Sequence, residues 1–69
     1  MNETTTLAVG GMHCEACVTS VNRALERLDG VVSARAALAT AEVVVCYDHS
    51  RLSVDDLIGV IEDAGFAAR

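Results

Sequence analysis

The sequence predicts an α+β fold, a ferredoxin-like βαββαβ sandwich with two helices on one face of a four-stranded antiparallel sheet. Two observations indicate this fold class. The chain has 69 residues, of which 52% are apolar, enough for one small hydrophobic core. Its local patterns also run in the order strand, helix, strand, strand, helix, strand, with no repeat or low-complexity tract between them. We therefore expect a single domain over residues 1–69.

The first part of the chain predicts one strand and one helix. In residues 4–10, apolar Leu7 and Val9 alternate with Thr6 and Ala8, as in a strand with one buried face. Residues 16–28 carry a helical stripe of apolar side chains, formed by Cys17, Val21, Ala24, Leu25 and Leu28. Because Gly30 follows this stripe, we expect the helix to end there.

Three further strands are expected after this helix. Residues 31–37 and residues 42–47 predict two strands joined by a short hairpin loop, the second rich in β-branched side chains. Residues 66–69 predict a last, short strand. That strand looks clipped at Arg69, which favours a domain excised from a longer polypeptide.

A second helix is expected between the last two strands. Ser53 is its predicted N-cap, and Asp56 stands three residues later in the capping-box position. The predicted buried face of this helix consists of Val54, Leu57, Ile58 and Ile61. Gly65 is expected to end it.

Charge and composition exclude several classes of function. The net charge is −5 and the five basic residues are scattered, which argues against binding nucleic acid, since that needs clustered Lys and Arg. An acidic domain instead attracts a partner with a basic docking face. The chain shows neither a signal peptide nor a membrane-spanning apolar run, so we expect a soluble, cytoplasmic protein if the sequence is complete. Three cysteines without a secretory signal make a disulfide framework unexpected.

Two cysteines near the start of the first predicted helix are the main functional signal. Cys14 and Cys17 are three residues apart, where the first strand gives way to the helix. Unpaired N–H groups and the helix dipole favour negative charge at such a position, and a thiol there has a lowered pKa. The sequence therefore predicts a surface dithiol that reacts with electrophiles or binds soft metals.

Three chemistries compete for this dithiol. A thioredoxin-type redox role is disfavoured because the chain has no proline for a cis-proline loop facing the thiols. A closed structural zinc site needs four protein ligands, and no second cysteine pair completes one. Two thiolates suit Cu(I), a soft ion of low coordination number, and leave one side open to a partner thiolate. We therefore expect a binding and transfer module rather than an enzyme, with a dithiol oxidoreductase as the rival from another class.

The sequence also resembles a known family. The run Gly10-Gly11-Met12-His13-Cys14-Glu15-Ala16-Cys17 is similar to the Gly-Met-x-Cys-x-x-Cys signature of heavy-metal-associated domains. Further agreement comes from Leu28-Asp29-Gly30-Val31, Val45-Cys46-Tyr47-Asp48 and Ala64-Gly65-Phe66. The resemblance implies the ferredoxin-like fold and Cu(I) bound by Cys14 and Cys17. Members of this family are small copper chaperones, N-terminal domains of copper or zinc/cadmium P-type ATPases, and mercury-handling proteins.

Four other residues near the motif or in the core receive an expected role. Met12 packs under the loop as adaptable core filling, and in the family it tethers the loop rather than ligating the metal. His13 is a solvated loop residue or a third ligand that widens the choice toward Zn(II). Cys46 is expected to pack in the core or the sheet. Phe66 packs near the metal loop in the family, where Phe is typical of ATPase domains.

These expectations combine into one functional hypothesis. Cys14 and Cys17 bind Cu(I) and exchange it with another Cys-x-x-Cys domain, most simply as the N-terminal domain of a copper-exporting P-type ATPase. A stand-alone copper chaperone is the alternative, as is a Zn(II), Cd(II) or Hg(II) domain of the same family, with His13 or Glu15 completing a zinc or cadmium site. An exposed dithiol also allows a metal-bridged homodimer.

Overall fold

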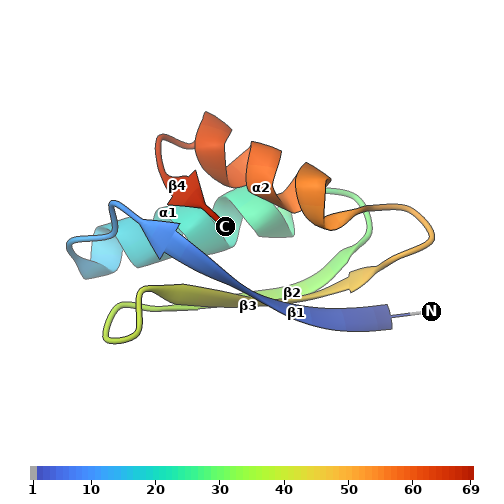
Figure 1. Ribbon diagram of the computed structural model, residues 1–69, viewed down its shortest axis with the longest axis horizontal. Helices are drawn as coiled ribbons and strands as arrows, with labels where there is room; N and C mark the ends of the chain where they lie inside the picture. Colours follow the sequence, from blue (N-terminus) through green and yellow to red (C-terminus); the bar gives the residue numbers. More distant parts are fainter. Residues whose placement is uncertain (1) are drawn as a thin grey trace.

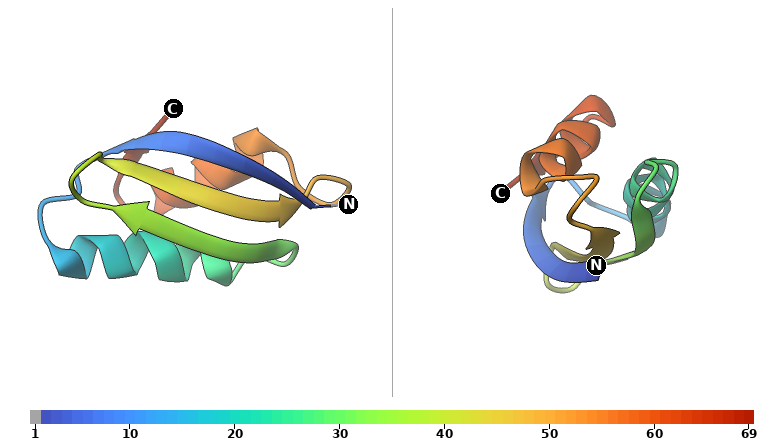
Figure 2. Two further views of the ribbon diagram at one scale, coloured as in Figure 1. Left: turned by 90° about the horizontal axis from the view of Figure 1, so that it is seen from below. Right: turned by 90° about the vertical axis from the view of Figure 1, so that its right-hand side faces the viewer.

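The computed structural model describes residues 2–69 and confirms the expected fold class. Its elements are β1 (Asn2–Gly10), α1 (Glu15–Glu26), β2 (Val31–Ala37), β3 (Glu42–Asp48), α2 (Val54–Asp63) and β4 (Ala67–Ala68). All strand pairs are antiparallel, and the sheet order is β2-β3-β1-β4. Both helices lie on one face of the sheet, and the other face is left uncovered (Figures 1 and 2).

The bounds of four elements differ from the sequence prediction, and one of these differences is that β3 ends at Asp48 rather than at residue 47. β1 begins at Asn2 rather than at residue 4, because its polar start pairs with β3 as far as Asp48. α1 occupies Glu15–Glu26, so it starts one residue earlier and ends two residues sooner than expected. β4 is only Ala67–Ala68. These differences all lie at the ends of elements. There, strand pairing and packing determine the last residue of an element, and the local sequence pattern is weakest.

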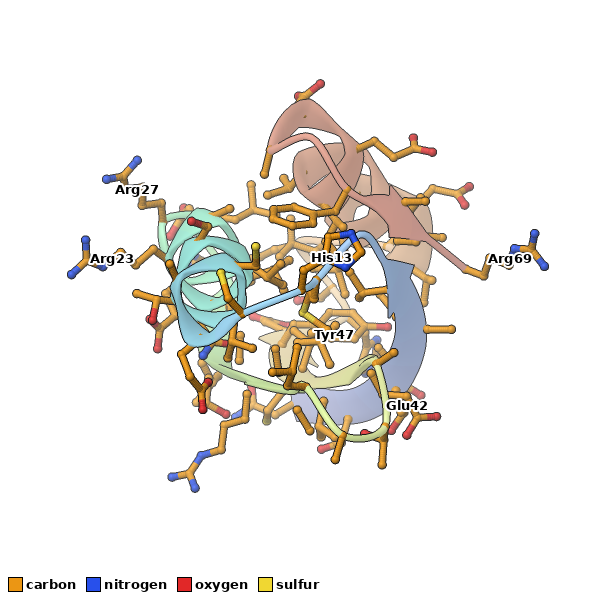
Figure 3. All side chains as sticks on the ribbon, turned by 90° about the vertical axis from the view of Figure 1, so that its left-hand side faces the viewer. His13, Arg23, Arg27, Glu42, Tyr47 and Arg69 are labelled. Carbon is orange, nitrogen blue, oxygen red and sulfur yellow. The ribbon has the colours of Figure 1, made fainter. Side chains whose placement is uncertain are left out.

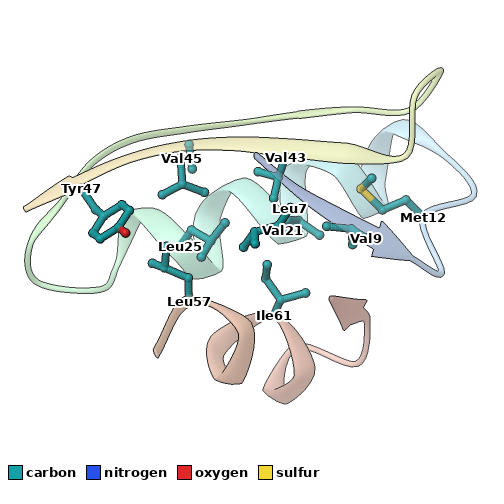
Figure 4. Packing of buried hydrophobic residues seen from close by; sticks show 11 residues of the cluster. Leu7, Val9, Met12, Val21, Leu25, Val43, Val45, Tyr47, Leu57 and Ile61 are labelled. Carbon is teal, nitrogen blue, oxygen red and sulfur yellow. The ribbon is translucent and has the colours of Figure 1, made fainter. Parts of the chain in front are cut away.

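The core lies between the inner face of the sheet and the two helices. It is formed by Leu7, Val9, Met12, Val21, Leu25, Ala34, Val43, Val45, Tyr47, Leu57 and Ile61. Figure 4 shows β3 contributing side chains at every second position, each directed toward the helices. Leu25 and Leu57 are fully buried, and each is central to its own helix face. The predicted apolar stripes of both helices therefore face the core, with their outer members half-buried.

The predicted signals at the helix ends are present in the structure: a capping box begins α2, and a glycine follows each helix. The Asp56 amide donates to Ser53 Oγ at 3.4 Å, and the Ser53 amide donates to Asp56 Oδ2 at 3.0 Å, a complete capping box. Gly30 has a φ of +104° and Gly65 a φ of +97°. These values lie in the left-handed region that glycine adopts without strain, so each glycine turns the chain after its helix.

Cys46 lies on the outer face of the sheet rather than in the core. Along β3 the buried residues alternate with outward ones, and Cys46 falls at an outward position. It is half-buried between Thr4 on β1 and Ser33 on β2, its register partners. The expectation of sheet packing holds and that of core packing does not. The sequence could not show which face of the sheet Cys46 points to, because that depends on the register of the strand.

Candidate metal site

The motif loop joins the end of β1 to the start of α1, at one end of the sandwich (Figure 1). Gly11 opens this loop with a φ of +99°, a left-handed conformation that a side chain would strain. Met12 then turns inward and is 8% exposed, as part of the core. The loop is thus anchored from below at Met12 while Cys14 stays exposed.

Cys14 and Cys17 are held by the first turn of α1. Cys14 is the N-cap residue, with φ −157° and ψ 171°, and its carbonyl accepts the amides of Cys17 at 3.0 Å and Val18 at 3.2 Å. This turn brings the two Sγ atoms to 3.5 Å from each other. Cys14 is exposed and Cys17 is half-buried, so the pair is open on the Cys14 side.

The electrostatics of the turn favour thiolate at Cys17. A hydrogen bond from the backbone of His13 is the largest cause that lowers the pKa of the Cys17 thiol, followed by the contact with Cys14 Sγ. Partial burial opposes them, and the pKa still lies below its ordinary value. Thiolate is the form of cysteine that binds metals and attacks electrophiles.

Phe66 lies against the opposite side of the loop. A Cβ built at Gly11 would meet Phe66 Cδ1 at 3.4 Å, so the ring and the loop backbone are in close contact. Phe66 is also half-buried against the core. Two segments distant in the sequence, the loop before α1 and the turn after α2, therefore meet at the site.

His13 is not brought together with the cysteines as a third donor. Its side chain is exposed, and in Figure 3 it lies toward β1, away from α1 and from Arg23 on that helix. Within residues 2–69, no group of three or more His, Cys, Asp or Glu side chains converges to hold a metal. At this end of the molecule, the two thiols of Cys14 and Cys17 are the candidate donors.

This arrangement of fold and dithiol matches a known family. The model of the heavy-metal-associated domain matches residues 6–67. The chain belongs to the heavy-metal-associated domain family. Its assignment rests on nearly the whole chain, including the loop, both helices and the sheet, and not on the cysteine motif alone.

Relatives of this heavy-metal-associated domain fall into several groups. It is 50% identical over 60 residues to the cation-transporting ATPase HMA5 of Oryza sativa, covering 87% of this chain and 6% of that protein. It is 41% identical over 64 residues to the periplasmic component of mercuric transport from Pseudomonas fluorescens, covering 93% of this chain and 70% of that one. Among solved structures, the CopZ metallochaperone superposes with a TM-score of 0.93 at 37% identity, covering 97% of this chain and all of its own.

Family membership makes the chain a heavy-metal-binding domain rather than a catalytic one. The ATPases that carry such a domain are enzymes as whole proteins, and this chain spans only a small part of their length. None of the helices in residues 2–69 is long and apolar enough to cross a membrane.

Cys14 is itself the N-cap of α1, a role that the sequence pattern did not predict. The apolar stripe predicted a helix start near Ala16, and cysteine is not among the residues that commonly cap a helix. The structure gives Cys14 an extended N-cap backbone but no side-chain hydrogen bond to the helix amides. The N-cap position of α1 is thus occupied by a side chain that makes no capping hydrogen bond.

Proposed function

We propose that this domain binds one Cu(I) ion through Cys14 and Cys17 and exchanges it with another Cys-x-x-Cys domain. The observation that carries this proposal is the pair of Sγ atoms, 3.5 Å apart and open on one side at a helix N-terminus. Two soft sulfur donors with no third protein ligand suit an ion of low coordination number. Binding as thiolates releases the two thiol protons to water.

The order of steps in metal transfer follows from the difference in exposure between Cys14, which is exposed, and Cys17, which is half-buried. A thiolate of the partner attacks the bound ion from the Cys14 side, giving a three-coordinate intermediate. Cys14 then leaves and takes up a proton, and a second partner thiolate displaces Cys17. The ion stays in the same oxidation state throughout, so no oxidant or reductant is needed.

The setting we propose is the N-terminal domain of a copper-exporting P-type ATPase, on the cytoplasmic side of its membrane. The similarity to the rice ATPase and the contact of Phe66 with the loop support this setting. The CopZ similarity supports the alternative, a stand-alone cytoplasmic copper chaperone. The mercuric transport relative keeps Hg(II) as a candidate cargo, and Zn(II) or Cd(II) would need His13 or a carboxylate to move to the dithiol.

Titration of the reduced protein with Cu(I) against a competing Cu(I) chelator tests the proposal. We expect one tightly bound ion per chain, lost in Cys14→Ala and in Cys17→Ala. Cys46→Ser is the matched control, because Cys46 lies on the outer face of the sheet, and it should bind as the wild type does. Unchanged affinity after Cys14→Ala would falsify the proposal. Transfer is then followed by mixing the loaded protein with a purified, metal-free Cys-x-x-Cys domain and measuring copper in each after separation.

Metal preference is tested separately. Competition of Cu(I), Zn(II) and Cd(II) for wild type and His13→Ser should give the same order of affinity, with Cu(I) first. A loss of Zn(II) affinity confined to His13→Ser would instead assign His13 as a ligand.

A further inference from the structure

Ala41, in the turn that joins β2 to β3, has a strained backbone. Its φ of +54° makes it the one residue other than glycine, among those that the structure describes, with a left-handed conformation. A residue with a Cβ adopts this conformation at a cost in free energy. Strain of this kind persists where the surrounding contacts hold the residue in place, and it often marks a functional position. The contacts of Ala41 therefore bear on what the turn does.

The left-handed backbone lets Ala41 make two hydrogen bonds in different directions. Its amide donates to the Leu38 carbonyl at 3.3 Å and closes the turn, and its carbonyl accepts the Val9 amide at 2.8 Å. If Ala41 were extended, it would exchange both bonds with Val9, as a hydrogen-bonded antiparallel pair does. The turn would then lose the bond that closes it. The left-handed conformation is thus what joins the β2–β3 turn to β1.

Val9 lies at the point where β1 separates from β3. The register of these two strands ends with Ala8 opposite Glu42, so the bond from Val9 to Ala41 extends their pairing by one residue. The side chain of Val9 is 2% exposed and belongs to the core, and on the other side Val9 lies opposite Ala68 of β4. On the β3 side, the end of β1 is therefore held by a bond that depends on the backbone of Ala41.

The motif loop begins directly after this bond. Gly10 pairs with β4, and Gly11 then turns the chain toward Met12, which is buried in the core. Figure 4 shows Met12 at the same end of the molecule as the turn between β2 and β3. Cys14 follows Val9 by five residues. The position of Val9 therefore sets where the loop with the first cysteine starts.

We propose that Ala41 is a positioning residue for the motif loop: through its bond to Val9 it fixes the end of β1, and with it the loop that leads to Cys14. The contact between Gly11 and the Phe66 ring forms when the loop starts from this point. A displaced loop moves Cys14 relative to Cys17, which is held inside α1. The consequence for metal affinity rests on the function proposed above, whereas the conformation of the loop does not.

Ala41→Val tests this inference, because a β-branched side chain is strongly disfavoured in the left-handed region. We expect amide exchange at Val9 to become about tenfold faster, while exchange at Leu7, opposite Val43 in the register, stays unchanged. The NMR contact between Gly11 and the Phe66 ring should weaken. Cu(I) affinity should fall by about tenfold or more, the usual loss when a group that positions a metal ligand is removed.

A second variant removes the bond without changing the turn. An ester in place of the Val9 amide, introduced by chemical synthesis of the chain, deletes the donor and leaves Ala41 as it is. It should weaken the Gly11–Phe66 contact and the Cu(I) affinity as Ala41→Val does. This variant decides the matter if Ala41→Val fails to fold.

Two substitutions in the turn serve as controls. Ala41→Gly adopts the left-handed conformation without strain and should keep wild-type exchange at Val9, the Gly11–Phe66 contact and Cu(I) affinity. Ala39→Val places the same side chain at a turn position outside that region and should also leave all three unchanged. An intact Gly11–Phe66 contact in both the ester and Ala41→Val contradicts the proposal, as does wild-type exchange at Val9 in Ala41→Val. If the wild type binds no Cu(I), the proposed function fails, and the exchange and contact measurements still decide the role of Ala41.

Discussion

Gly11 and Phe66 lie in contact, such that a methyl group on Gly11 would approach Phe66 Cδ1 to 3.4 Å. The loop that bears the cysteines is therefore fixed from outside by the aromatic ring and from inside by Met12, which is buried in the core. Both contacts are apolar. They hold the loop in shape and leave the thiols of Cys14 and Cys17 to each other.

Gly11→Ala should destabilise the domain by about 1–2 kcal/mol. The left-handed φ of +99° strains an alanine, whose methyl group would lie 3.4 Å from Phe66 Cδ1. Gly10→Ala is the matched control, since its Cβ would meet Ala67 Cβ at an ordinary 3.6 Å and its φ is not in that region. Denaturant unfolding of the metal-free variants measures both. Equal losses for the two would mean that loop conformation does not limit stability here.

Cys14→Ser should stabilise the metal-free protein while removing metal binding. A serine hydroxyl at the extended N-cap can accept a hydrogen bond from a helix amide, a bond that the thiol does not make, for a gain of roughly 0.5–1 kcal/mol. Cys17→Ser serves as the control, because residue 17 lies inside the first turn and cannot cap it. Thermal unfolding with reductant and chelator gives the comparison. A destabilised Cys14→Ser protein would show that the thiol already contributes to the cap.

Alkylation by iodoacetamide should report a lowered pKa at Cys17. In a Cys14→Ala, Cys46→Ser background, the rate at Cys17 should still rise at a pH below the ordinary thiol value, because the backbone hydrogen bond from His13 remains. With Cys14 restored, the inflection should move to lower pH, since the contact between the two sulfur atoms also lowers the pKa of Cys17. Mass spectrometry of digested samples assigns each site. An inflection at the ordinary thiol pKa in both backgrounds would contradict the electrostatic account of the turn.

Stability should fall in acid as Asp48 takes up a proton. The Ser50 hydroxyl and amide donate to Asp48 Oδ1 at 2.6 and 3.0 Å, and lower the pKa of this carboxyl to about 2. A lowered folded pKa means that the contribution is complete above the unfolded value of 3.8 and is lost as the pH falls through about 2. Ser50→Ala should raise the pKa of Asp48 and reduce the loss of stability in this range. Ser20→Ala is the control, because the Ser20 hydroxyl donates to the Ala16 carbonyl, and it should change neither the pKa of Asp48 nor the loss of stability in acid. Carboxyl titration and thermal unfolding measure these two quantities.

Asn22→Ala should cost about 1–2 kcal/mol and expose the β2 edge. The variant leaves the half-buried amide of Ala36 without the acceptor at 2.8 Å that joins α1 to this strand. Asn22→Asp retains an acceptor and should keep most of the stability. Faster amide exchange at Ala36, seen only in the alanine variant, would tie the loss to this one hydrogen bond. Identical behaviour of both variants would point to side-chain packing instead.

Much of the candidate site could be predicted from the sequence because it is local. Cys14 and Cys17 are three residues apart, and one turn of helix is enough to bring such a pair together. The capping box at Ser53 and the glycine after each helix are local in the same way. His13 stayed open as a third ligand at the level of sequence, since its direction depends on how the loop meets β1.

The sequence by itself determined the order of the elements, the apolar faces of both helices and the position of the dithiol. Each depends on periodicity or on spacing within a few residues, which the chain encodes directly. Only the tertiary structure decided that Cys46 faces outward, that Asn22 bonds to the Ala36 amide of β2 and that Phe66 meets the loop at Gly11. These follow from strand register and from the packing of segments that are far apart in the chain.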